Sequence, residues 1–550
     1  MNMAKSIWLC PRNPKDPMTQ LRSLHQAPTL LVPEKVLMPE GAQTGHAVLV
    51  DDGRILAVGP FPEVAAQAQS LLTAANAAAP KPGATADAAV PKPVADRAAT
   101  EPVRIDLPGR LLMPGFIDTH HHLTQTFGKS LVFGEPSEIF QRVWVPMETN
   151  MDAEAIDVAT RLAAWESLRG GFTTVTDAGT RSNVEVSAIS DVTTDVGLRC
   201  VLGVICNDLG GGVRTSTVAE VVAAAEHHLS RWDAESLVHP SLAVSIPEVA
   251  SDEALAAITR LAREAGVPFQ THLNEHIVAV ERSLISGGER PLERLARLGA
   301  LGPELLAAHA TLLTPREIRL LRDSGGAIAY NPVASSWKGN AVAPALLMHE
   351  FGMRIGLGTD GTRSDAFRLL DAAETAQRLT GGMDVIDSSA GGGWTWLEQG
   401  LRGGADAVGL SGQIGEISSG ARADLLVLNI DTPEFVPSWD VPWELVRLAN
   451  RDQIEAVIVD GKLRLEHGWP VDWDGRAFLE RAKDVSRRVV ENSPITRIDP
   501  NAADHRARWM SEHGTAPVGG SAQVNTPRNG GPSSVNAPRN GGAVSARDDF

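Results

Sequence analysis

The sequence contains few cysteines. Among its 550 residues there are three, Cys10, Cys200 and Cys206. This number is too small for a disulfide framework, so a hydrophobic core must stabilise the fold. Buried thiols are typical of proteins in a reducing cytosol, and we expect a cytoplasmic protein.

The chain also lacks long apolar runs and an excess of basic residues. It has no run of about 18 apolar residues, and its N-terminus has no continuous apolar core before its prolines, so we expect no membrane span and no signal peptide. Lys and Arg number 50 against 67 Asp and Glu, which gives a formal net charge of -17. Phosphate binding depends on clustered cations, so this balance argues against nucleic acid as a partner.

Two segments have the composition of disordered protein. Residues 68–100 are rich in Ala and Pro, and the tail carries the imperfect repeat VNTPRNGG and VNAPRNGG. Such segments cannot bury enough apolar surface to become ordered. We expect a disordered insertion at 68–100 and a disordered tail at 513–550.

Between these segments, short β-branched runs alternate with helical patterns. Eight such runs, from LLMPGFIDTH to RIGLGTDG, are spaced over about 300 residues. The alternation predicts an α/β protein with a (β/α)8 barrel, although a doubly wound sheet would give a similar pattern. The flanking segments GHAVLVDDGRILAVG and IEAVIVDGKLRLEHG alternate at the strand period. They predict a small β-sandwich domain formed by both chain ends.

These patterns also predict the domain boundaries. We expect an N-terminal extension at 1–26, the two parts of the β-domain at 27–110 and 413–470, the barrel at 111–412, and C-terminal helices at 471–512.

Polar residues stand at the ends of several predicted strands. The segment PGFIDTHHH ends in three histidines. Because side chains alternate along a strand, His120 and His122 should lie on one face and His121 on the other. The segments THLNEH, LAAHATLL and GLGTDG also place polar residues where an apolar run ends. Active sites of barrels gather at this edge of the strands, and imidazole with a carboxylate suits zinc or ferrous iron.

In combination, these motifs resemble the amidohydrolase superfamily, within it the branch of cytosine, guanine and 8-oxoguanine deaminases and triazine hydrolases. The resemblance extends from GHAVLVDDGRILAVG through PGFIDTHHH, THLNE, GTDG and GEISSGARADLLVLNID to VIVDGKLR. It implies a barrel with a small β-domain and a divalent metal ion. Binuclear members use a lysine from the fourth strand, and HPSLAVSIP has none, so we expect one ion, Zn²⁺ or Fe²⁺. The implied ligands are His120, His122, His272 and Asp360.

The resemblance also implies catalytic roles. Glu275 matches the glutamate that transfers protons, and His309 matches the histidine that polarises the attacking water or the substrate. Asp360 would hold or accept a proton as well as bind the metal. We therefore expect a hydrolase of carbon–nitrogen bonds other than peptide bonds, in which water activated at the metal displaces ammonia from a purine, pyrimidine, pterin or triazine-like ring.

Other activities remain open at this stage. They are hydrolysis of a cyclic amide, as in imidazolonepropionase, and displacement of chloride or an alkylamine, as in triazine hydrolases. A barrel that serves as a scaffold without chemistry is disfavoured by the intact set of polar residues. The expected partners are a small heterocyclic substrate and water, and relatives of this kind suggest a homo-oligomer.

Three further residues are candidates for substrate contact. Gln125 follows the metal histidines, where the deaminases often place a glutamine, and Trp144 matches a region that lines the pocket of relatives. The alternatives are a plain loop glutamine and a tryptophan of the core. Arg363, in GTDGTRSD, could bind a substrate carboxylate or instead pair with Asp365. The segment NPVASSWKGN at 331–340 departs from the Pro-x-Ser-Asn that relatives commonly have, and the resemblance assigns it no role.

Overall fold

The computed structural model describes residues 17–78, 102–135, 139–210, 213–233, 236–382, 386, 391–498 and 502–513. The chain forms two compact units, Met1–Ile498 and Asp499–Phe550. The second unit contains helix α19 (Ala502–His513), and all other elements below belong to the first. Every helix in the described ranges is too short or too polar to cross a membrane.

Eight parallel strands form a nearly closed barrel in the first unit. The strands pair in chain order, and the first and last meet where the backbone N–H of Asp360 donates to the carbonyl of His120 at 2.8 Å. The predicted barrel and its eight strands are confirmed. The strands are β6 (Phe116–His121), β7 (Phe172–Asp177), β8 (Arg199–Ile205), β11 (Val238–Val244), β12 (Phe269–Leu273), β13 (Leu305–His309), β14 (Ala327–Tyr330) and β15 (Arg354–Leu357).

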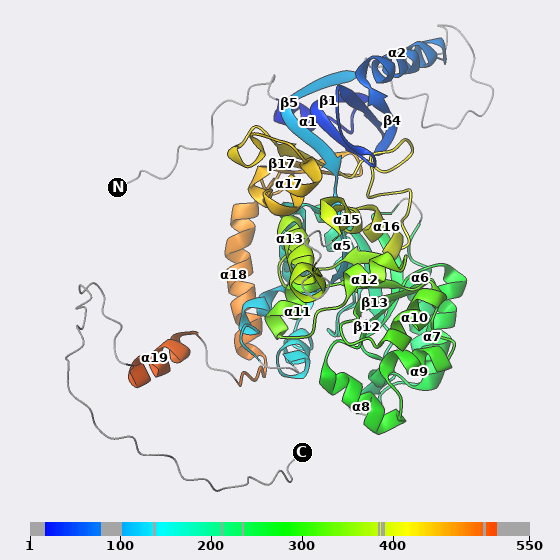
Figure 1. Ribbon diagram of the computed structural model, residues 1–550, viewed down its shortest axis with the longest axis vertical. Helices are drawn as coiled ribbons and strands as arrows, with labels where there is room; N and C mark the ends of the chain where they lie inside the picture. The colour runs from blue at the N-terminus through cyan, green and yellow to red at the C-terminus, as the bar shows by residue number, and fades with distance from the viewer. Residues whose placement is uncertain are drawn as a thin grey trace, which may run out of the picture. The chain divides into compact units, whose positions relative to one another are not determined.

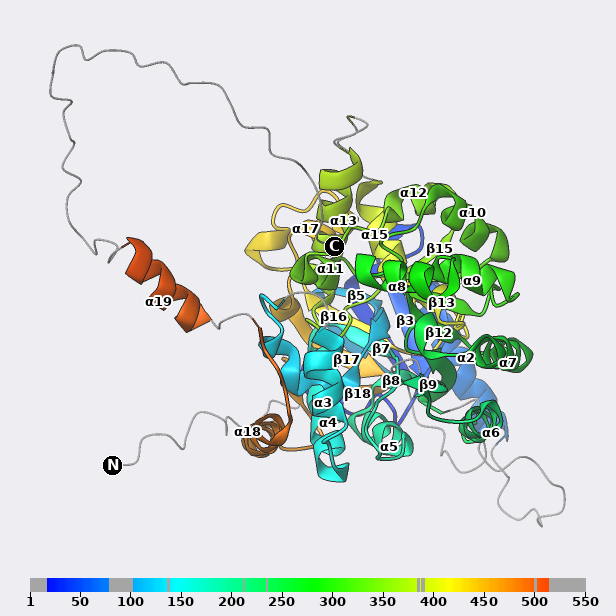
Figure 2. The same ribbon diagram turned by 90° about the horizontal axis from the view of Figure 1, so that it is seen from below.

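Helices surround the strands, as Figure 2 shows in a view along the barrel. Their ends are set by local sequence. In α10, Thr314 and Glu317 form a reciprocal capping box, and Gly325 ends the helix in the left-handed conformation. The main helices are α4 (Ala153–Arg169), α5 (Ser187–Val196), α6 (Val218–Leu229), α7 (Asp252–Ala265), α8 (Ile277–Gly287), α9 (Pro291–Arg297), α10 (Pro315–Ser324), α11 (Pro332–Lys338), α12 (Ala345–Glu350), α13 (Ala366–Gln377), α15 (Gly392–Gly400) and α16 (Arg402–Ala407).

Both chain ends contribute to a second sheet of nine strands, which lies beside the barrel in Figure 1. Strand β5 from the N-terminal part pairs antiparallel with β16 from the C-terminal part. Ile55 in β4 also bonds to Ala421 ahead of β16, so the sheet bends around one apolar core. The strands are β1 (Thr29–Met38), β2 (Gly41–Thr44), β3 (His46–Asp51), β4 (Arg54–Pro60), β5 (Val103–Pro114), β16 (Leu425–Asn429), β17 (Ile454–Val459), β18 (Lys462–Glu466) and β19 (Trp469–Pro470).

The structure moves two of the predicted boundaries. Helix α1 (Pro17–Leu21) buries Met18 and Leu21 in the core of the second sheet, so ordered chain begins before residue 27. Helix α2 (Phe61–Ala78) occupies the start of the predicted insertion at 68–100, because its Ala-rich sequence favours a helix and Ala68 packs against the sheet. The rest of the predicted insertion and the tail at 514–550 lie outside the described residues.

Candidate metal centre and cavity

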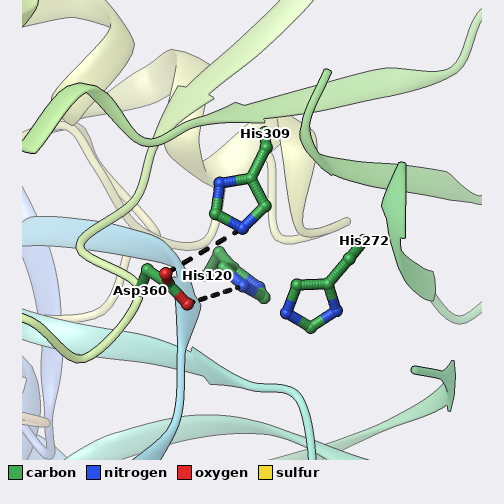
Figure 3. Close-up of side chains that lie close together, drawn as sticks. All are labelled: His120, His272, His309 and Asp360. Carbon is green, nitrogen blue, oxygen red and sulfur yellow. Dashed lines mark ion pairs between the residues drawn. The ribbon is translucent and has the colours of Figure 1, made fainter. Parts of the chain in front are cut away.

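The predicted site residues meet at the C-terminal edge of the barrel strands. His120 lies near the end of β6, His272 lies in β12, His309 ends β13, and Asp360 follows β15. Figure 3 shows these four side chains turned toward one another. One possible ligand atom from each lies within 4.8 Å of every other. Four strands far apart in the sequence therefore place N and O donors around one point.

His122 lies at the same point. Its Nε2 is 3.2 Å from Asp360 Oδ1 and 3.2 Å from His272 Nε2. The Nε2 of His120 is 3.3 Å from the same oxygen, Asp360 Oδ1. One carboxylate oxygen thus faces two imidazoles of the His-x-His pair, as expected if His120 and His122 lie on one face of the strand. His121 instead contacts Ser364, with 3.1 Å between Nε2 and Oγ.

Hydrogen bonds distinguish the roles of two histidines. Nδ1 of His272 lies 2.7 Å from the carbonyl oxygen of Ser245, so Nδ1 carries the ring proton and Nε2 keeps a lone pair for a metal. In His309, Nδ1 accepts from the side-chain amide nitrogen of Asn331 at 3.2 Å, so the proton is on Nε2. This Nε2 is 3.6 Å from Glu275 Oε2. Nε2 of His272 can therefore bind a metal ion, whereas Nε2 of His309 can donate a hydrogen bond.

Burial keeps these imidazoles neutral. It lowers the pKa of His122 to about 3 and that of His309 to about 3, and it lowers the pKa of His272 well below its usual value. Neutral imidazole is the form that binds a divalent ion. Burial opposes ionisation of Asp360, but the Lys338 ammonium and the adjacent imidazoles of His120 and His122 hold the pKa of this carboxyl well below its usual range.

The donor set fits a divalent ion. The Nε2 atoms of His120 and His309 are buried and have no hydrogen-bond partner in the described part of the chain. Buried polar atoms without a partner are costly, and for His120 a metal would remove this cost. Imidazole nitrogens with one carboxylate suit zinc or ferrous iron.

The backbone around the site is strained. His309 has φ of 70° and Asp360 has φ of 56°, both in the left-handed region that residues with a Cβ rarely adopt. Such conformations persist where the surrounding structure holds them, and they cluster at functional sites. Here they direct two side chains toward the site just after their strands end.

A cavity of about 460 Å³ opens onto the site. His122, His272, Glu275 and Asp360 line one end of it, and Ile139, Phe140 and Trp144 are among the apolar residues that line its walls. Of the predicted substrate contacts, Gln125 and Trp144 line the cavity.

Arg363 is not among the residues that line this cavity. It is 45% exposed and its guanidinium lies 3.6 Å from Asp365. The structure therefore shows the second alternative considered for Arg363, pairing with its neighbour. The reason is local, because Asp365 caps α13 and its carboxylate is held beside Arg363.

Sequence reasoning missed three cationic side chains that line the cavity, those of Arg181, Arg282 and Lys338. Lys338 Nζ lies 2.8 Å from Glu275 Oε1 and 2.7 Å from Asp360 Oδ2. Arg181 stacks on the ring of Phe140 at 4.2 Å and bonds to the buried carboxylate of Glu148 at 2.9 Å. For Lys338 a signal was present, since it belongs to the atypical segment 331–340. For Arg181 no pattern in the sequence indicated its place.

Comparisons with known proteins agree with this geometry. Residues 111–464 match the model of the amidohydrolase family, and residues 47–68 match an imidazolonepropionase-like composite domain of bacteria. A 5-methylthioadenosine/S-adenosylhomocysteine deaminase of Halobacterium salinarum is 30% identical over 402 residues, which cover 70% of this chain and 90% of that protein. A 5'-deoxyadenosine deaminase of Methanopyrus kandleri is 29% identical over 388 residues, covering 70% and 87%.

Solved structures have the same fold. An adenosine deaminase from Xanthomonas campestris with bound zinc superposes with a TM-score of 0.72 at 25% identity and covers 84% of this chain and 98% of that one. An atrazine chlorohydrolase from Arthrobacter aurescens, complexed with zinc, gives a TM-score of 0.68 at 21% identity and covers 83% and 100%. The chain belongs to the amidohydrolase family and is a hydrolase that acts on carbon–nitrogen bonds.

Proposed function

We propose that this protein is a metal-dependent aminohydrolase that releases ammonia from an aminated nitrogen heterocycle, with an aminopurine as the first candidate ring. The observation that carries the proposal is the meeting of two carboxylates, Glu275 and Asp360, with four imidazoles beside one cavity. The sequence relatives, which are named as deaminases of adenosine derivatives, support the choice of ring.

The proposed ligands of a single divalent ion are His120, His122, His272 and Asp360. They share one region around Asp360 Oδ1. A divalent ion in such a site lowers the pKa of a water molecule to about 7, so that hydroxide is available at neutral pH. Zinc is the first candidate, and ferrous iron suits the same donors.

Glu275 is the proposed general acid and base. It follows the ligand His272 by three residues and lines the cavity beside Asp360. Its carboxylate would take a proton from the attacking water and deliver it to the ring nitrogen next to the amino-bearing carbon. Burial opposes ionisation of Glu275, but His309 and Lys338 hold its pKa well below its usual value, so the group starts as a base.

Asp360 and His309 complete the proposed chemistry. The Nε2–H of His309 would donate a hydrogen bond to the oxygen of the attacking water, which gains negative charge as Glu275 takes its proton. As the tetrahedral centre collapses, Asp360 would take the remaining proton of the added hydroxyl and pass it to the departing amino group through Oδ2, the oxygen that does not face His120 and His122. Ammonia then leaves as a neutral molecule.

The cavity suits a planar ring. Its volume of about 460 Å³ lies within the range of pockets for small molecules. Trp144 and Phe140 offer apolar faces on which a ring can stack, and Gln125 offers an amide to the ring edge. These three are the proposed substrate contacts.

The experiment that tests this proposal is ammonia release by the zinc-loaded protein across purines, pyrimidines, pterins and triazines. We expect release from at least one aminated ring and none from the same ring lacking the amino group. A ring-opened acid without ammonia would instead show the cyclic amide reaction. The match to an imidazolonepropionase-like domain does not favour that reaction, because residues 47–68 lie in β3, β4 and the first part of α2, and none of them lines the cavity.

A further inference from the structure

Lys338 stands inside the candidate site, although the chemistry above gives it no role. It ends the short helix α11 after β14, where Gly339 turns the chain with φ of 66°. Its side chain is only 16% exposed, and it lines the cavity next to Glu275 and Asp360. The ammonium lies 2.8 Å from Glu275 Oε1 and 2.7 Å from Asp360 Oδ2.

The two oxygens of each carboxylate face different groups. Asp360 presents Oδ1 to His120 and His122 and Oδ2 to Lys338. Glu275 presents Oε2 to His309 and Oε1 to Lys338. The ammonium therefore bonds to a different oxygen of Asp360 from the one that faces His120 and His122.

An ammonium has three N–H donors, and two of them are used by Glu275 and Asp360. Within the described ranges, no other acceptor lies within hydrogen-bond distance of Nζ. Because Lys338 lines the cavity, its third N–H is available to a bound molecule. An atom that meets this N–H must be a hydrogen-bond acceptor.

The formal charges around Lys338 also favour an acceptor at its third N–H. With neutral histidines, Glu275, Asp360 and Lys338 together carry one negative charge, and a divalent ion would bring the site to one positive charge. Without Lys338 the loaded site would be neutral. At the atom that the Lys338 ammonium meets, an acceptor with negative partial charge is therefore favoured over a donor.

We propose that Lys338 contacts the substrate and selects rings that carry an oxo or other negatively polarised acceptor next to the ring nitrogen served by Glu275. This inference rests on the proposed function for the orientation of the ring. A ring nitrogen at Glu275 is flanked by the amino-bearing carbon on one side and by one further ring carbon on the other. The substituent on that further carbon is the group that Lys338 would bind.

Three purines test this directly, because they share the amino group at C6 and differ in the group at C2, where the oxo form also brings one additional ring N–H. They are 6-aminopurine, 6-amino-2-oxopurine and 2,6-diaminopurine, which present a hydrogen, an acceptor and a donor. The dissociation constants would be measured by calorimetry with the zinc-loaded protein, together with ammonia release. A hydrogen bond to a charged group predicts that the oxo ring binds roughly 10- to 100-fold more tightly than the diamino ring.

Lys338→Met and Lys338→Arg form the matched pair of variants. The first removes the charge at similar length, and the second keeps it. Metal content is measured for each, since Lys338 contacts a proposed ligand. The measured quantity is the dissociation constant of the diamino ring divided by that of the oxo ring. We expect this ratio to fall to nearly one in Lys338→Met and to stay high in Lys338→Arg.

The inference is overturned if the wild-type protein binds the three rings equally, prefers the diamino ring or fails to bind the oxo ring. A preference that is unchanged in zinc-loaded Lys338→Met also overturns it. If the ranking holds but no ring releases ammonia, the proposed function fails and the role of Lys338 in binding stands. If ammonia is released without the ranking, only the role of Lys338 fails.

Discussion

The buried carboxylate of Asp118 accepts hydrogen bonds from both the backbone N–H of Thr359, at 2.9 Å, and the hydroxyl of the same residue. Its Oδ1 also accepts from the backbone N–H of His120 at 3.2 Å. Thr359 directly precedes Asp360. The Asp118 carboxylate therefore holds the backbone of one proposed metal ligand, His120, and of the residue next to another, Asp360. Asp118 thereby joins the first and last strands of the barrel where the site is built.

We predict that Asp118→Ala weakens metal binding as well as the fold. The variant leaves buried N–H groups without an acceptor, and this costs about 1–3 kcal/mol of unfolding free energy. Asp208→Ala is the control, because the buried carboxylate of Asp208 likewise accepts from the backbone N–H and the hydroxyl of one residue, Ser251, and neither of the two lines the cavity. Denaturant unfolding and zinc titration check this. Equal zinc affinities for the two variants would contradict the role of Asp118.

Substitution of His272 and of His309 by alanine should have different effects on the bound metal. Nε2 of His272 has a lone pair directed at the site, whereas Nε2 of His309 carries a proton. We predict that His272→Ala loses the bound metal and that His309→Ala retains it, with kcat reduced by about 10²–10³-fold through loss of one hydrogen-bond donor. Metal analysis by mass spectrometry beside steady-state kinetics measures both. Loss of metal from His309→Ala would instead make His309 a ligand.

Glu275→Gln should remove proton transfer and keep the site intact. The amide has nearly the same shape but cannot accept the proton, so kcat should fall by about 10²–10⁴-fold with zinc content unchanged. Glu248→Gln is the control, because Glu248 also lines the cavity and its carboxylate oxygens have no hydrogen-bond partner in the described chain. Its kcat should change little. A comparable loss in both variants would argue against a specific role for Glu275.

Gly358 is required by the close approach of three strands. A Cβ at this position would lie 2.1 Å from Asn331 Oδ1 and 3.0 Å from His120 Cβ. Gly358→Ala should therefore displace the partner of His309 and destabilise the protein by about 1–3 kcal/mol. Gly287→Ala at the end of α8 has no atom within 4 Å of the added carbon and should be neutral. Thermal unfolding of the two variants measures the difference, and equal melting temperatures would contradict it.

Sequence reasoning was most successful where a pattern is repeated or chemically unusual. The eight barrel strands, and the histidines and aspartate at their ends, could be predicted because polar residues interrupt apolar runs at one edge of a sheet. The helix α2 was missed because an Ala- and Pro-rich composition dominated the interpretation of a segment whose first part packs through Ala68. Lys338 and Arg363 show a further limit. Which loop side chain enters a cavity depends on backbone direction and capping contacts, and these are set only in three dimensions.

The most direct test of the account is metal content and ammonia release measured on the same preparation, before and after treatment with a chelator. We predict about one zinc or iron per chain, loss of ammonia release when the metal is removed, and recovery when one equivalent of zinc is returned. Full release of ammonia by protein without metal, or a metal content that does not depend on His120 and Asp360, would contradict the central claim.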